Sequence, residues 1–130
     1  MPTEIIFSGP KFEIRAWVSR NGECQVKEFL NDLEEDDVSD ADRLWYLLKR
    51  TANIGVLENK VQMRPLRSGI YEFKARHTAR ILFFYDQNRL IICSHGFTGK
   101  KGKGNRAIQG QLERALRAKE DYFGERGKGK

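Results

Sequence analysis

Three short segments rich in apolar residues occur in the second half of the chain, and only tight connections separate them; the first segment alternates apolar and polar residues. They span about residues 70–77, 80–86 and 90–97. Alternation with a period of two predicts strands, and the connection DQNR at 86–89 supplies the turn residues of a hairpin. Connections this short make neighbouring strands antiparallel, so we expect an antiparallel meander.

The first half predicts one strand and two helices. Residues 11–18 alternate polar and apolar side chains, as in a strand with one face on a core. The first helix is predicted by an apolar stripe at helical spacing, formed by Val26, Phe29, Leu30 and Leu33. The acidic run at 34–37 ends that stripe and is expected to be a solvated turn.

Ser39, with Asp42 three residues later, resembles a capping box that opens the second helix. This helix carries Leu44, Leu47 and Leu48 on one face. A last helix follows the Gly/Lys-rich loop at 99–105, and its stripe is formed by Ile108, Leu112, Ala115, Leu116 and Lys119.

These elements predict an α+β fold, in which a small antiparallel or mixed sheet of four to five strands packs with two N-terminal helices and a C-terminal helix. A length of 130 residues is the size of one domain, and 39% hydrophobic residues suffice for a core. We expect a single domain over residues 1–130, with its core at about 10–123 and a flexible basic tail at 124–130.

The cysteines, the first residues and the length of the apolar stretches indicate the cell compartment. Cys24 and Cys93 lie outside any metal-ligand spacing, so we expect two buried thiols. The chain begins without a basic region followed by an apolar one, and it has no stretch of about 18 apolar residues. We therefore expect a cytoplasmic protein without a membrane partner.

Charge divides the chain into two unlike halves. Residues 1–59 hold 7 Lys/Arg against 12 Asp/Glu, a net −5, whereas residues 60–130 hold 17 against 6, a net +11. A basic half of this kind attracts polyanions, and nucleic acid and acidic proteins are the usual candidates.

The first strand of the meander separates an apolar face from a charged face that carries Glu72, Lys74 and Arg76. If the next strand pairs through a short hairpin, Arg80 lies close to Lys74 or Arg76. Like charges opposite each other are unfavourable, and an anionic ligand such as phosphate would relieve the repulsion. The alternative is a solvated sheet face that Glu72 partly neutralises.

A cationic, glycine-rich loop directly follows the third strand. Its glycines permit close approach and its lysines neutralise phosphates, as in loops that contact a nucleic-acid backbone. The two histidines, His77 and His95, are candidates for proton transfer, although a lone histidine in a strand is more often structural.

The stretch LRSGIYEFKARHTARILFFYDQNRLIICSHGFTGKK, at residues 66–101, resembles the core of the RelE/HigB superfamily of bacterial toxins, particularly its phage-derived, HigB-like branch. Three family motifs carry the resemblance: G-[LI]-[YW]-E-[LF]-[RK]-x-R at 69–76, an arginine that opens an aromatic-rich strand at 80–85, and H-G-F-x-K-K, to which HGFTGKK at 95–101 corresponds with one additional residue. The predicted order of elements is also that of the family, over about residues 10–123.

The resemblance implies the toxin of a toxin–antitoxin system, which acts as a ribosome-associated endoribonuclease on mRNA, inhibits translation and needs neither metal nor cofactor. In this family the ribose 2′-hydroxyl attacks the adjacent phosphate, so that a cyclic phosphate and a 5′-hydroxyl result. Carried over by position, Arg76 and Arg80 are expected at the phosphate, and Lys74, His95 or Glu72 in proton transfer. The RNA-binding candidates are Arg67, Lys100, Lys101, Lys103 and Arg106.

The implied partners are mRNA on the ribosome and a cognate antitoxin, with a monomer expected when the toxin is free and a hetero-oligomer with the antitoxin. Two alternatives come from other classes. The order of three strands and a basic last helix resembles a non-catalytic double-stranded RNA-binding module. The basic half could also be a docking surface for an acidic protein.

Overall fold

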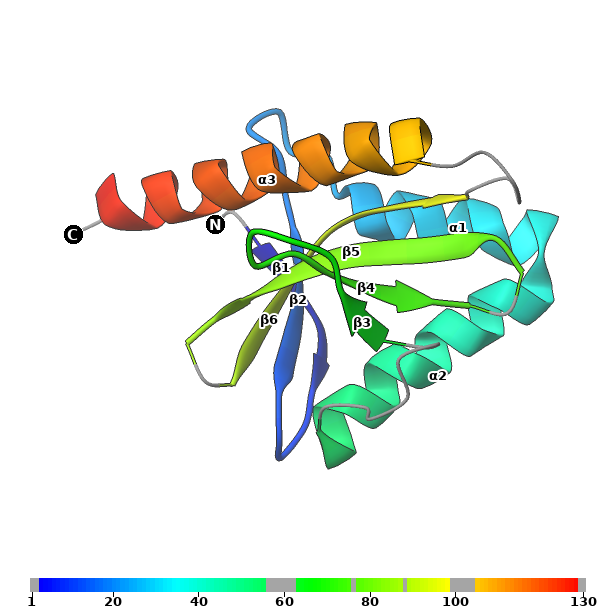
Figure 1. Cartoon of the computed structure of the whole chain (residues 1–130). Coiled ribbons are helices and arrows are strands. Elements are labelled where there is room, and N and C mark those ends of the chain that lie inside the picture. Colours follow the sequence, from blue (N-terminus) through cyan, green and yellow to red (C-terminus); the bar gives the residue numbers. More distant parts are fainter. Residues whose placement is uncertain (1–2, 56–62, 76, 88, 99–104, 129–130) are drawn as a thin grey trace.

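The computed structural model describes residues 3–55, 63–75, 77–87, 89–98 and 105–128, without the side chains of 105–108 and 125–128. Figure 1 shows the elements along the chain. They are β1 (Thr3–Ser8), β2 (Glu13–Trp17), α1 (Gln25–Asp36), α2 (Val38–Ile54), β3 (Met63–Pro65), β4 (Tyr71–Lys74), β5 (Ala79–Asp86), β6 (Leu90–Thr98) and α3 (Asn105–Lys128).

The six strands form one mixed sheet in the order β1-β2-β6-β5-β4-β3. Strands β4, β5 and β6 pair antiparallel, which confirms the predicted meander. The only parallel pair among the described strands is β2 with β6, and the long connection between them contains α1, α2 and the strands β3, β4 and β5. The α+β class is confirmed, but the sheet has six strands rather than four or five.

Both extra strands lie at edges of the sheet. β3 has three residues, and β1 has a register shift between Ile5 and Phe7. Short or bulged strands are common at sheet edges, where a long regular strand would invite pairing with other chains. Neither gives an uninterrupted alternation in the sequence, which is why the prediction missed them.

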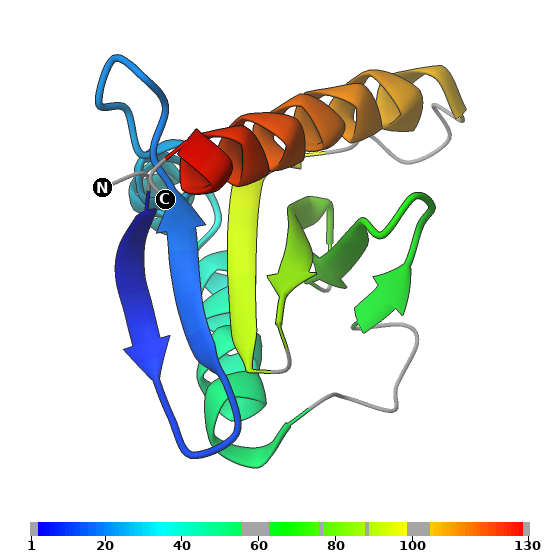
Figure 2. The same cartoon turned by 90° about the vertical axis from the view of Figure 1, so that its left-hand side faces the viewer.

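Helices cover both faces of the sheet (Figures 1 and 2). Phe73, Ile81 and Phe83 point to one face and form a core with α1 and α2. Leu82 and Phe84 point to the other face and form a second core with α3. The helix contributes Leu112, Ala115 and Tyr122 to this core. Because β5 is covered on both faces, its sequence is a continuous apolar run over residues 81–84.

Helix α1 packs directly on β6 at Gly96. An ideal Cβ on this glycine would lie 2.1 Å from Cδ2 of Phe29, so no larger residue fits there without displacing α1. The glycine of the H-G-F motif therefore has a packing role in this structure.

The junction between α1 and α2 differs from the prediction. Residues 34–36 belong to the last turn of α1, and only Asp37 separates the two helices. The Asp37 carboxylate accepts the backbone N–H of Asp40 at 3.1 Å, so Asp37 rather than Ser39 is the N-cap of α2. The prediction of a Ser39 cap was wrong because Asp37 offers the same acceptor chemistry two residues earlier.

Helix α3 extends to Lys128, beyond the expected end of the core at Phe123. Glu125 and Arg126 are good helix formers and continue the helix despite the neighbouring glycines. Cys93 is a buried free thiol, as predicted, whereas the free Cys24 is half-buried and precedes α1 as its N-cap residue.

Candidate functional site

A cluster of charged side chains lies on the α3-facing side of the sheet, where β3, β4 and β5 run side by side. The register places Arg64 opposite Glu72 and Lys74 opposite Arg80. The predicted proximity of Lys74 and Arg80 is thus confirmed. The four residues share a face with Leu82, which is the partner of Glu72 on β5. We call these four residues the charged strand cluster.

Glu72 is the anionic centre of the charged strand cluster. Its side chain has no exposed surface, although a carboxylate is rarely buried unless it is paired. Arg64 Nε donates to Glu72 Oε1 at 2.5 Å, and Arg80 Nη1 lies 3.6 Å from Glu72 Oε2. Two guanidinium groups thus lie beside one carboxylate, and Lys74 is paired with Arg80 in the register, so the cluster has an excess of positive charge.

Several polar atoms of the charged strand cluster are buried without a hydrogen-bond partner among the described residues. They are Oε2 of Glu72 and both Nε and Nη1 of Arg80, whose side chain is only 16% exposed. Such unsatisfied buried groups are unfavourable and concentrate at functional sites. No hydrogen bond to a described residue therefore competes with an anion that approaches the exposed part of the Arg80 side chain.

Two predicted cations have exposed surface: Lys74, a member of the charged strand cluster, and Arg67, which lies outside it. Lys74 is partly exposed, and Arg67 is exposed in the loop between β3 and β4. This loop turns at Ser68 and Gly69, both with positive φ, and Lys119 of α3 donates to the Ser68 carbonyl at 3.0 Å. The backbone around Arg67 is therefore fixed to α3.

His95 lies inside the protein, only 1% exposed. A register shift in the pairing of β5 with β6 places it opposite Leu82, facing α3. Its ring nitrogens contact Ser94 Oγ and Gln111 Oε1, each at 2.8 Å. Burial, with a smaller effect of the Arg114 charge, lowers the pKa of His95 from 6.5 to about 4, so the ring is neutral at pH 7.

Other predicted site residues are outside the described part of the chain. Arg76, Lys100, Lys101 and Lys103 are not among the described residues, and only the backbone of Arg106, in α3, is described.

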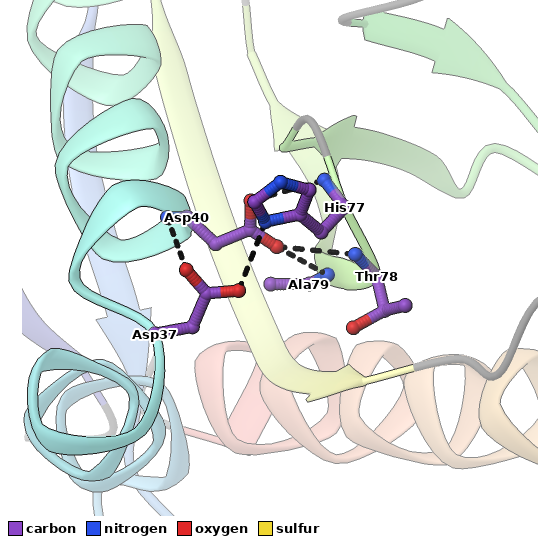
Figure 3. Close-up of polar contacts among 5 residues, drawn as sticks. All are labelled: Asp37, Asp40, His77, Thr78 and Ala79. Carbon is purple, nitrogen blue, oxygen red and sulfur yellow. Dashed lines mark hydrogen bonds and ion pairs between the residues drawn. The ribbon is translucent and has the colours of Figure 1, made fainter.

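The turn between β4 and β5 is fixed by a carboxylate that the sequence analysis did not identify (Figure 3). Asp40, fully buried in the first turn of α2, accepts the backbone N–H groups of His77, Thr78 and Ala79 at 3.0, 3.1 and 3.1 Å. Because this turn joins Lys74 to Arg80, Asp40 helps to set their register. Its only sequence signal is an acidic residue in an otherwise apolar helix face.

His77 adds an ion-pair contact to the same cluster. Its Nδ1 lies 3.0 Å from Asp37 Oδ2 and 3.3 Å from Asp40 Oδ1. The three side chains lie close enough to bind one metal ion. However, both Asp40 oxygens already accept N–H groups, and the start of α2 is electrostatically unfavourable for a cation. The arrangement is that of a structural clamp on the turn.

Arg64 is the member of the charged strand cluster that sequence reasoning missed. It lies in a strand of three residues, and its partner Glu72 is eight positions away. Only the pairing of β3 with β4 shows that the two side chains meet.

No helix in the described part of the chain is long and apolar enough to span a membrane. A search of curated protein sequences finds no match. Two solved structures from Staphylococcus aureus are similar. The YoeB dimer has a TM-score of 0.50 and 22% identity, over 69% of this chain and 99% of that chain. The YoeB–YefM complex has a TM-score of 0.47 and 21% identity, over 60% and 92%.

At such identity the YoeB dimer shows the fold, and the expected RelE-like fold is thereby confirmed. The narrower HigB-like assignment stays a prediction. The sequence model of the phage derived protein Gp49-like family (DUF891) matches residues 28–120, which is most of the chain and includes the whole charged strand cluster. The chain therefore belongs to the phage-derived Gp49-like family.

Proposed function

We propose that the protein is the toxin of a toxin–antitoxin system and acts as a metal-independent endoribonuclease on mRNA at the ribosome. The observation that carries this proposal is the largely buried Arg80 guanidinium, two nitrogens of which have no hydrogen bond in the described part of the chain, beside Lys74 and Arg64 on one sheet face. The RelE-like fold and the Gp49-like family support the same reading.

In the proposed reaction Arg80 and Lys74 hold the scissile phosphate. The ribose 2′-oxygen forms a bond to phosphorus while the bond to the 5′-oxygen breaks, so that negative charge grows on the non-bridging oxygens. Positioned guanidinium and ammonium groups stabilise that charge. Arg76 is a further candidate for the phosphate, as the family resemblance implies.

Proton transfer is assigned to Lys74. Among the described candidates, Glu72 and His95 are buried. Lys74 is partly exposed and lies in β4 opposite Arg80 of β5. As the ammonium group that it is in this proposal, Lys74 donates its proton to the departing 5′-oxygen, while the proton of the 2′-hydroxyl passes to water. In this proposal Arg67, Lys100, Lys101, Lys103 and Arg106 contact the phosphates of the neighbouring nucleotides.

The test is primer extension on a defined mRNA in a purified bacterial translation system, with and without ribosomes. The comparison includes the wild type, Arg80→Lys and Arg80→Ala. We expect cleavage within the translated region and a loss of about 100-fold or more in both variants, the usual effect of removing one group that stabilises transition-state charge. Even Lys loses the fork of donors that matches a phosphate.

Arg15→Lys is the matched control, because Arg15 also lies in the sheet and pairs with an acidic residue, Glu13, at 2.5 Å. It should cleave like the wild type. Intact mRNA at micromolar wild-type protein would contradict the nuclease proposal and favour the non-catalytic RNA-binding module, which salt-dependent RNA affinity would then test.

A further inference from the structure

Glu72 and Arg64 form the part of the charged strand cluster that the proposed reaction does not yet use. Glu72 lies with no exposed surface between two guanidinium groups, and Arg64 is 41% exposed. A carboxylate enclosed in this way cannot touch an RNA substrate, but it determines where both arginines lie.

We propose that Glu72 is a positioning residue that holds Arg64 and Arg80 together as one anion site, in which Arg64 is a second contact to the substrate phosphate. This inference rests on the proposed function, because it names the role of two residues at the same site.

The first argument is the energetics of Arg80. Burial of a guanidinium is unfavourable unless an opposite charge compensates it. Arg80 is only 16% exposed, it faces Lys74 across the strands, and Glu72 is its acidic partner among the described residues. Without the Glu72 charge, repulsion from Lys74 and Arg64 would favour a conformation in which Arg80 points to solvent.

The second argument is how each arginine is held. Glu72 Oε1 accepts only Nε of Arg64, at 2.5 Å. The remaining guanidinium nitrogens of Arg64 have no hydrogen bond within the described part of the protein, and the side chain is substantially exposed. The 3.6 Å approach of Arg80 Nη1 to Oε2 exceeds hydrogen-bond distance. One carboxylate thus orients both arginines, and a phosphate can contact the exposed part of each side chain, which is 41% for Arg64 and 16% for Arg80.

The test uses Glu72→Gln, Arg64→Gln and the double variant. Glu72→Gln keeps the size and the acceptor for Arg64 but removes the charge. We expect its cleavage rate at saturating protein to fall about 100-fold, the usual effect of a misplaced catalytic group. The half-saturating concentration should change by less than about threefold, because uniform binding to the RNA is preserved.

Arg64→Gln should lower the saturating rate by at least about tenfold, as expected for a lost contact to transition-state charge. The double variant should be no slower than the slower single variant, because residues that act as a unit are not additive. Glu72→Asp, which keeps the charge, should restore part of the lost rate. Arg15→Gln is the matched control and should cleave like the wild type.

A second readout separates this inference from the proposed function. Inorganic phosphate is titrated into the ¹⁵N-labelled protein while the Nε–H signals of Arg64 and Arg80 are recorded. We expect both signals to shift in the wild type and neither to shift in Glu72→Gln. If wild-type protein shows these shifts but cleaves no mRNA, the nuclease proposal falls and the two-arginine anion site stands.

If the wild type cleaves mRNA while Glu72→Gln and Arg64→Gln cleave at the wild-type rate, the inference is wrong and the nuclease proposal stands. If phosphate shifts neither arginine signal in the wild type, the anion site is rejected. Circular dichroism and thermal unfolding verify that each variant folds. Should Glu72→Gln fail to fold, Arg64→Gln decides the outcome alone, since its side chain lies at the surface.

Discussion

At the scale of single residues, the two histidines have different environments. His95 is buried between Ser94 and Gln111, whereas the His77 ring is 59% exposed and contacts Asp37 and Asp40. The H-G-F motif that carries much of the family resemblance therefore has a structural explanation here: its histidine links β6 to α3, and its glycine admits Phe29. A shared motif does not by itself identify a catalytic residue.

The burial of His95 predicts acid sensitivity. Its pKa is 6.5 when unperturbed and about 4 in the fold, so only the unfolded chain gains this proton between those values. The contribution of neutral His95 to the free energy of unfolding is therefore fully present above pH 6.5 and is lost as the pH falls towards 4. The total loss in the free energy of unfolding is at most about 3 kcal/mol. Denaturant unfolding of the wild type and His95→Gln from pH 4 to 7.5 measures it.

The His95→Gln variant should show a smaller loss of stability with acid than the wild type, whereas His77→Gln should retain the slope that is due to His95. Because the carboxylates titrate equally in both proteins, the difference between the wild-type and His95→Gln curves isolates this group. Parallel curves for these two proteins would contradict the prediction.

At the scale of elements, Asp40 connects α2 to the turn between β4 and β5. Asp40→Asn keeps the shape but leaves one acceptor oxygen for three backbone N–H groups. We expect the free energy of unfolding to fall by about 2 kcal/mol, the scale of lost hydrogen bonds to a charged group. Hydrogen exchange at the amides of Thr78 and Ala79 should become faster.

Asp42→Asn is the matched control, because Asp42 is an exposed aspartate in the same helix. It should change the unfolding free energy by less than about 0.5 kcal/mol, as is usual for surface substitutions. Equal effects of the two substitutions would indicate that the helix N-terminus, not the turn, is the source of the stability.

The elements also show which parts of the fold and of the site can be predicted from the sequence. The helix α2 was predicted because one apolar face repeats along the whole element, and β5 because a short apolar run is bounded by tight connections. The proximity of Lys74 and Arg80 followed from a short hairpin. The pair Arg64–Glu72 depends on a three-residue strand, and Asp40 reaches a turn 37 to 39 positions away. Sequence periodicity carries no information about such long-range pairing, so these contacts could not be predicted.

At the scale of the whole molecule, the basic half of the sequence forms the meander and α3, whereas the acidic half supplies α1 and α2. The sheet separates the two sets of helices, so the charged strand cluster lies on the α3 side. A polyanion is therefore attracted to one side of the protein. An acidic antitoxin segment that covers this side would block the proposed reaction without altering the fold.

The proposed function predicts that expression of the protein alone arrests bacterial growth. Induction should lower the incorporation of labelled methionine within minutes, because cleaved mRNA stops translation, and Arg80→Lys should abolish the effect. Arg15→Lys should remain toxic.

Immunoblots matched for protein level exclude differences in expression, which matters because a toxic protein selects for cells that make little of it. Normal growth and translation at a level of wild-type protein equal to that of Arg80→Lys would contradict the toxin proposal. In that case the anion site proposed at the charged strand cluster would have to serve a non-toxic RNA contact.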